Sequence, residues 1–179
     1  MDGGDDAELV ARCLRGDVEA FEPLVARYQR VLFGVALRFI GDREDARDAT
    51  QNAFVKAYEK LCTYDPSHRF FSWIYRIVVN ESLNLRQRRP AHQRLDEGLA
   101  SSESPYAEAE AHETAERVQA GLLQLSPGHR EVVVLRHFAE LSYSDISDAL
   151  GLPEKTVKSR LYTARQRLGQ ILLTEDGIR

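Results

Sequence analysis

The sequence predicts an all-α protein made of two small helical domains joined by a flexible acidic linker, the second domain containing a helix-turn-helix. Apolar residues recur at helical spacing along most of the chain, and no segment shows the alternation that is typical of a strand. We place the first domain at residues 1–90, the linker at 91–112 and the second domain at 113–179. Domains of about 90 and about 70 residues have small cores, so an obligate partner is expected.

Glycine and proline divide the first domain into four predicted helices. The expected N-caps are Asp17 for the second helix and Asp42 for the third, and Pro90 ends the fourth. The predicted helices run from Asp5 to Arg15, from Asp17 to Gly41, from Asp42 to about Cys62 and from Arg69 to Arg89.

Polar, serine-rich sequence follows from Ala91 to Pro105, which is typical of a flexible linker. Helical periodicity resumes near Tyr106 and continues to Leu125. Ser126 and Pro127 then form an expected N-cap and first helical position.

The segment from Ser142 to Arg165 predicts two short helices around a tight turn. Gly151 stands where the turn requires a residue that tolerates positive φ, and Ser142 with Asp145 resembles a capping box. Thr156 can cap the second helix, unless Pro153 starts it earlier. Three apolar residues of this helix follow 3.6-residue spacing: Val157, Leu161 and Ala164. The polar and basic residues between them are left outward. This layout is that of a helix-turn-helix that inserts its second helix into a DNA major groove, and a helical hairpin with a solvated basic face is the alternative.

The net charge of −4 looks unfavourable for binding DNA, but the charges are unevenly distributed. Residues 68–94 hold six arginines against one acid, and residues 153–168 hold five basic residues against one acid. Between them, residues 95–116 hold seven acids and no lysine or arginine. Because phosphate binding depends on local patches, the two basic segments remain candidate nucleic-acid surfaces.

Composition excludes several classes of protein. No apolar run approaches the length of a membrane span, and the acidic N-terminus does not resemble a signal peptide, so a cytoplasmic protein is expected. Cys13 and Cys62 are far apart and fit reduced thiols, and no Cys/His spacing predicts a metal site. No catalytic motif or glycine-rich phosphate loop is present, so we expect no catalytic residues, no cofactor and no enzyme activity.

The fourth predicted helix combines aromatic and basic residues. Aromatic rings beside arginines suit single-stranded DNA, because bases stack on the rings while the cations follow the phosphates. The same aromatics also fit a core stripe, and Asn80 and Asn84 are either base contacts or exposed polar residues. The aromatic residues concerned are Phe70, Phe71, Trp73 and Tyr75.

Two blocks of the chain together resemble bacterial sigma factors of the small extracytoplasmic-function (ECF) group of the sigma-70 family. The first block is EAFEPLVARYQRVLFGVALRFIGDREDARDATQNAFVKAYEKL followed by FFSWIYRIVVNESLNLRQRR, and the second is LSPGHREVVVLRHFAELSYSDISDALGLPEKTVKSRLYTARQRL. The resemblance implies a non-enzymatic transcription factor that binds core RNA polymerase, recognises −35 and −10 promoter elements and promotes DNA opening. It also implies that the acidic linker runs along a basic channel of the polymerase, and that an anti-sigma factor hides both DNA-binding surfaces.

The resemblance assigns three sets of residues. The expected contacts with core polymerase, through the β′ coiled coil beside contacts with the β subunit, are Asp48, Gln51, Asn52, Phe54, Val55, Tyr58 and Leu61. The expected −10 contacts are Arg69, Phe70, Trp73, Arg76, Asn80, Asn84 and Arg88. The expected −35 contacts are Lys155, Thr156, Lys158, Ser159, Arg160, Thr163 and Arg165.

The chain departs from the family pattern at three places. Asn52 stands where glutamate is usual, Glu154-Lys155 where a glycine is common, and Thr163 where arginine is frequent. These departures affect the expected docking strength, the entry angle of the recognition helix and the −35 sequence that is read. Two other classes remain as alternatives: a dimeric repressor or activator that binds operators alone, and a helical module whose basic patches bind a protein.

Overall fold

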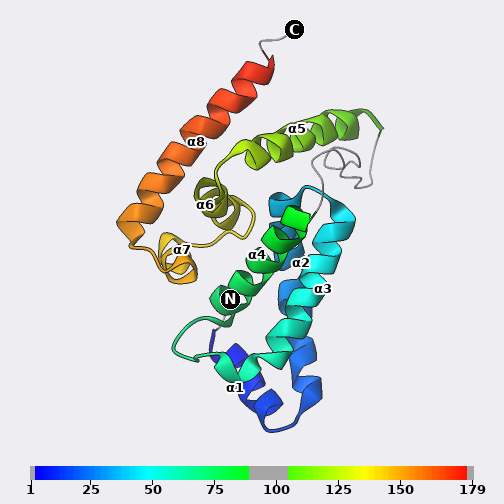
Figure 1. The fold of residues 1–179 in the computed structure, drawn as a ribbon, viewed down its shortest axis with the longest axis vertical. Coiled ribbons are helices and arrows are strands. Elements are labelled where there is room, and N and C mark those ends of the chain that lie inside the picture. Colours follow the sequence, from blue (N-terminus) through cyan, green and yellow to red (C-terminus); the bar gives the residue numbers. More distant parts are fainter. Residues whose placement is uncertain (1–2, 89–104, 177–179) are drawn as a thin grey trace.

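The computed structural model describes residues 3–88 and 105–176, and the side chains within 5–85 and 113–174 (Figure 1). Every regular element in these residues is helical, which confirms the predicted fold class. The first domain contains α1 (Gly3–Leu14), η1 (Val18–Phe21), α2 (Glu22–Ile40), α3 (Arg43–Glu59), η2 (Leu61–Thr63) and α4 (Phe70–Arg88). The second contains α5 (Pro105–Gln124), α6 (Pro127–His137), α7 (Tyr143–Leu150) and α8 (Glu154–Asp176).

Several helix ends follow the predicted local chemistry. The backbone N–H of Asp45 donates to Asp42 Oδ1 at 2.8 Å, which caps α3. Ser142 and Asp145 form a reciprocal capping box at the start of α7. Gly151 ends α7 in the left-handed region at φ 64°, where glycine carries no Cβ penalty.

Other ends differ from the prediction. Asp17 makes no side-chain cap, because its carboxylate accepts two hydrogen bonds from Arg12, and η1 separates it from α2. Thr156 does not cap α8, which begins at Glu154 directly after Pro153. α5 begins at Pro105, inside the segment predicted as linker, whose residues 91–104 lie outside the described residues.

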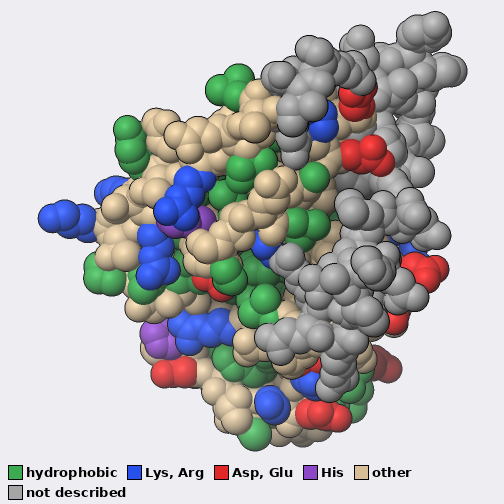
Figure 2. All heavy atoms as spheres, turned by 45° about the horizontal axis from the view of Figure 1, so that its top comes forward, with side chains coloured by type: hydrophobic (Ala, Val, Ile, Leu, Met, Phe, Trp, Pro, Cys, Tyr) green, Lys and Arg blue, Asp and Glu red, His purple; other side chains and the backbone are tan. Residues whose placement is uncertain are grey.

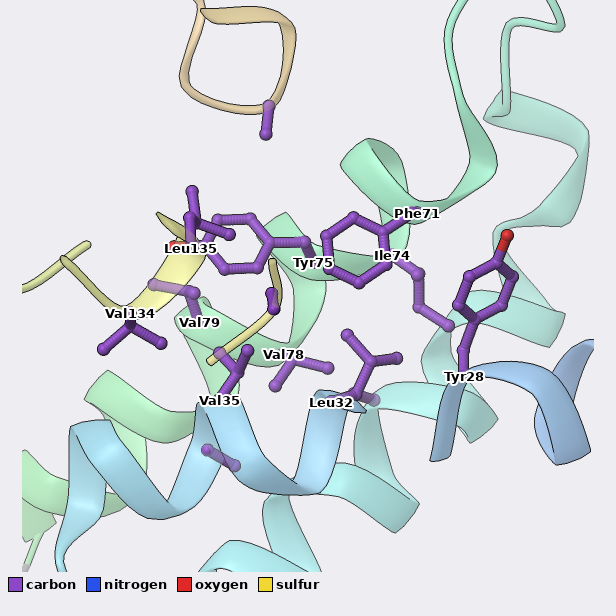
Figure 3. Close-up of a cluster of buried hydrophobic side chains, with 14 of the residues drawn as sticks. Tyr28, Leu32, Val35, Phe71, Ile74, Tyr75, Val78, Val79, Val134 and Leu135 are labelled. Atoms are coloured by element: carbon purple, nitrogen blue, oxygen red, sulfur yellow. The ribbon is translucent and has the colours of Figure 1, made fainter. Parts of the chain in front are cut away.

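The two domains share one hydrophobic core. Figure 3 shows side chains of α4 between those of α2 and α6, with the ring of Tyr75 beside Leu135. Tyr75 and Leu135 are both fully buried, although they belong to different predicted domains. The sequence predicted two domains connected only by a tether, but in the structure the two domains pack together. The reason is that α2 and α3 cover only part of the apolar surface of α4. The remaining apolar face packs against the second domain.

A buried arginine joins the ends of two helices across the domain boundary. Arg130 of α6 is 3% exposed, and its guanidinium donates to the carbonyls of Leu122, Leu123 and Leu125 at the end of α5. It also donates to Phe39 O near the end of α2 at 3.3 Å. Helix C-termini carry carbonyls that lack intrahelical partners and a partial negative charge, so the cation stabilises both ends at once.

Gly41 ends α2 at the same boundary, at φ 87°, where a Cβ would lie 2.8 Å from Leu123 Cδ1. We expect Gly41→Ala to lower the free energy of unfolding by about 1–2 kcal/mol, since alanine is disfavoured in this conformation. Gly34→Ala is the control, because φ is ordinary and a Cβ there meets nothing within 4 Å. It should raise stability by about 0.5–1 kcal/mol. Urea unfolding measures both, and equal effects of the two substitutions would contradict the expectation.

Candidate nucleic-acid and partner interfaces

The exposed face of α3 carries most of the predicted polymerase-docking set. Asp48, Gln51 and Asn52 are exposed, Val55 is 58% exposed and Tyr58 is 39% exposed. The two other members of the set, Phe54 and Leu61, are buried instead. Phe54 packs edge-on against Phe21 with ring centroids 6.4 Å apart, so it supports the face from beneath. The exposure of Tyr58 is compatible with its predicted outward role.

The sequence patterns did not single out two exposed apolar residues at the end of α1 and the start of η1. Leu14 at the end of α1 is 55% exposed, and Val18 at the start of η1 is 61% exposed. η1 ends at Phe21, whose ring lies 5.1 Å from that of Tyr58. Apolar exposure on a short helical turn has no periodic signal, which explains why Val18 could not be found from the sequence.

α4 presents its predicted −10 residues in different environments. Asn80 and Asn84 are exposed one turn apart, as their spacing predicted. Phe70 is fully buried, so it cannot contact a base in this conformation. Trp73 is half-buried and packs against Tyr64 and Phe70. The side chain of Arg88 lies outside the described side chains.

The two remaining −10 residues contact the second domain. Arg69 NH1 lies 2.6 Å from Asp145 Oδ1 in the first turn of α7. Arg76 donates through Nε to Ala149 O at 2.9 Å and through NH2 to Asp148 O at 3.1 Å, at the end of α7. Arg69, directly before α4, and Arg76 within it therefore both contact α7 in this conformation.

α8 has the predicted division between an inner and an outer face. Val157, Leu161 and Ala164 are buried at 0%, 1% and 0% exposure. Outward residues on the opposite face include Lys155, Lys158, Ser159, Tyr162 and Arg165, with Thr156 and Thr163 partly covered. Lys158 Nζ lies 3.3 Å from Glu154 Oε2 and 5.3 Å from the centre of the Tyr143 ring, which orients it along α7.

Two basic residues of the −35 set pack against α6. Arg160 is half-buried beside Gly128, and its charge opposes the rise that burial causes in the pKa of the Glu131 carboxyl. Arg165 NH2 lies 3.1 Å from His137 Nε2. Burial lowers the pKa of His137, and Arg165 lowers it further, so its imidazole is neutral near pH 7. Because it packs beside Gly128 and Glu131 of α6, Arg160 has a structural role in addition to any contact with DNA.

Lys and Arg side chains gather on the left of the molecule in Figure 2, the side on which α7 and the start of α8 lie in Figure 1. Local positive charge on an acidic chain supports the prediction made from the charge pattern. No helix within the described residues is long and apolar enough to cross a membrane. Those residues also hold no group of three metal-ligating side chains.

The architecture, a helical domain with an exposed polar face joined to a helix-turn-helix domain, is typical of a DNA-binding transcription factor of two modules. The family model for Sigma-70 region 2 matches residues 24–91, and the model for Sigma-70 region 4 matches residues 115–168. The chain is 35% identical to the RNA polymerase sigma-H factor of Pseudomonas aeruginosa, covering 93% of each protein. It is 30% identical to the ECF RNA polymerase sigma factor SigW of Bacillus subtilis, covering 86% of this chain and 89% of SigW.

Solved structures agree with these relatives. CnrH in complex with the cytosolic domain of CnrY matches with a TM-score of 0.75 and 30% identity, covering 95% of this chain and 98% of that chain. The sigma factor RpoE of Bartonella quintana, solved with the anti-sigma factor NepR, shares the fold at a TM-score of 0.66 and 23% identity. The chain belongs to the ECF group of the sigma-70 family of RNA polymerase sigma factors. It is a non-enzymatic factor that initiates transcription through RNA polymerase and promoter recognition.

Proposed function

We propose that three exposed surfaces divide the work of initiation. The outer face of α3, from Asp48 to Tyr58, docks on the β′ coiled coil of core polymerase, and Leu14 and Val18 extend it with apolar area. The exposed side of α4, with Asn80 and Asn84, contacts the −10 element during opening. The outer face of the start of α8 contacts the −35 element.

The division of α8 into two faces carries this proposal. Three apolar residues bind the helix to its domain, and the residues between them project lysine, serine and tyrosine outward. Lysine suits phosphates and guanine edges in the major groove. The capping box and the left-handed Gly151 set the angle between α7 and α8, which is the geometry that a helix-turn-helix requires.

We also propose that a protein partner regulates the chain. CnrH, which is similar to this chain over 95% of its length, was solved with the cytosolic domain of CnrY. An anti-sigma factor of comparable function would hold the chain away from polymerase. A factor that serves core polymerase works in the cytoplasm, and we propose that location here.

The test is transcription from fragmented genomic DNA by core polymerase reconstituted with the full chain, followed by mapping of the start sites. Lys158→Ala should weaken binding of the holoenzyme to all mapped promoters and lower the salt dependence of log K by about 1, as for the loss of one phosphate contact. Asn80→Ala should leave closed-complex binding intact and reduce opening, which permanganate reactivity of unpaired thymines measures.

Arg30→Ala is the control, because Arg30 is exposed on α2, outside the three proposed surfaces. It should change neither binding nor opening. Failure of the wild-type chain to direct initiation at any site would reject the proposal. Equal loss of binding and opening in both test variants would reject the division of labour between α4 and α8.

A further inference from the structure

Helix α7 of the second domain lies across the start of α4 and contacts two arginines of the predicted −10 set, Arg69 directly before the helix and Arg76 within it. Asp145 uses its two carboxylate oxygens for different partners. Oδ2 accepts from the Ser142 backbone at 3.2 Å and from its hydroxyl at 2.8 Å, which completes the capping box. Oδ1 pairs with Arg69 NH1 at 2.6 Å. The Asp145 side chain is only 15% exposed, so the pair is screened less than an ordinary surface pair.

The other end of α7 binds the second arginine. Arg76 donates to the carbonyls of Ala149 and Asp148, two of the last carbonyls of the helix, which have no intrahelical partner. The C-terminus of a helix also carries a partial negative charge. One short helix therefore offers Arg69 a carboxylate and Arg76 a pair of carbonyl oxygens, which are the kinds of acceptor that a nucleic-acid backbone also offers.

Two polar side chains on the covered face of α4 are buried without a hydrogen-bond partner among the described residues. The atoms concerned are Ser72 Oγ and Tyr75 OH, which lie on α4 between the two arginines. Burial raises the pKa of Tyr75, in agreement with its isolation from water. Buried polar groups without partners are rare in a surface meant to stay closed. Ser72 lies near Leu141 and Asp145, and Tyr75 lies beside Leu135 of α6, so separation of the second domain from α4 would return both hydroxyl groups to water.

We propose that α7 is an intramolecular competitor for nucleic acid, which occupies the two arginines of the predicted −10 set in the free chain and must leave them when promoter DNA binds there. The N–H groups that Arg69 and Arg76 donate to α7 are not available to a phosphate backbone until α7 leaves. The proposal rests on the proposed function of α4. It adds that the free chain is inhibited by its own helix-turn-helix domain, without a second protein.

The first test measures domain separation without DNA or polymerase. Donor and acceptor dyes are placed on the native, exposed Cys62 and on Leu173→Cys, with the buried Cys13 replaced by alanine. Asp145→Asn removes the charge that Arg69 binds but keeps an oxygen for the capping box, and we expect a fall in energy-transfer efficiency. Glu19→Gln, at an exposed acid of η1, is the charge-matched control and should leave the efficiency unchanged.

Arg76→Gln provides a second opening variant that does not touch the capping box. It should lower the transfer efficiency in the same way, and it decides the outcome if Asp145→Asn fails to fold. Unchanged efficiency in the folded variants would overturn the proposal, because α7 would then be held by contacts other than these two.

The second test measures binding of the free chain to a fluorescent 20-nucleotide single-stranded DNA of mixed sequence. Two freed arginines add up to two phosphate contacts, which steepens the slope of log K against log salt by about 1.4 for single strands. Between 200 and 50 mM salt, the affinity of Asp145→Asn should therefore rise by about sevenfold more than that of the parent. Glu19→Gln should follow the parent.

The two tests separate this inference from the proposed function. Lower transfer efficiency together with a steeper salt slope supports competition by α7. Lower efficiency with an unchanged slope overturns it, since the exposed arginines would then not bind nucleic acid. Loss of initiation by the reconstituted polymerase would reject the proposed function, and it would leave the energy-transfer result as it stands.

Discussion

Replacement of Arg130 by methionine should lower the free energy of unfolding by about 3 kcal/mol or more. Methionine fills a similar volume but donates no hydrogen bonds, so the carbonyls of Leu123 and Leu125 lose the guanidinium donor, and the Leu122 carbonyl keeps only the backbone N–H of Leu125. Each buried carbonyl left unsatisfied costs about 1–3 kcal/mol, and partial access of water reduces the sum. Urea unfolding followed by circular dichroism measures the change.

Arg30→Met is the matched control for this substitution. Arg30 is exposed on α2, so the same chemical change there should alter stability by less than about 0.5 kcal/mol. Arg130→Lys should recover only part of the loss, because an ammonium group lacks the planar fork that reaches several carbonyls. A loss below 1 kcal/mol in Arg130→Met would show that water replaces the guanidinium.

Replacement of Val55 by aspartate should weaken binding to core polymerase by about thirtyfold or more. Val55 is 58% exposed in the middle of the α3 face, and an interface that covers it would bury the unpaired carboxylate of an aspartate at a cost of about 2 kcal/mol or more. Valine and aspartate have similar helix propensities, so the fold should be retained. Fluorescence anisotropy of the labelled chain, titrated with core polymerase, measures the affinity.

Leu173→Asp makes the same kind of change on α8, where Leu173 is 72% exposed and lies outside the proposed docking face. It should bind core polymerase like the wild type. Equal weakening by both variants would indicate a general effect of charge, and normal binding by Val55→Asp would remove α3 from the interface.

Local signals in the sequence predicted the helices and the helix-turn-helix well. Val157, Leu161 and Ala164 were placed inward from spacing alone, and all three are buried. Gly151 and the Ser142–Asp145 pair were predicted from turn and capping chemistry, which depend only on neighbouring residues. The error at Asp17 is also local, because more than one residue near a helix start can serve as the cap. At α8 the structure has the earlier of the two predicted starts, directly after Pro153.

Contacts between distant residues were beyond these signals. Phe54 was predicted to dock on polymerase, yet it packs on Phe21, which lies 33 positions earlier in the printed sequence. The periodicity of α3 cannot separate a residue that faces a partner from one that faces η1. In the same way, nothing local indicates that Arg69 and Arg76 face α7, since each lies more than 70 positions from its partner.

The core shared by α2, α4 and α6 has a consequence for proteolysis and for the design of fragments. Tyr75 and Leu135 shield each other from water, so each domain alone would expose part of its hydrophobic core. Proteolysis within residues 89–104 would yield two fragments, and each would carry an exposed apolar surface that matches the other. Such pieces would tend to reassociate or to precipitate rather than behave as independent modules.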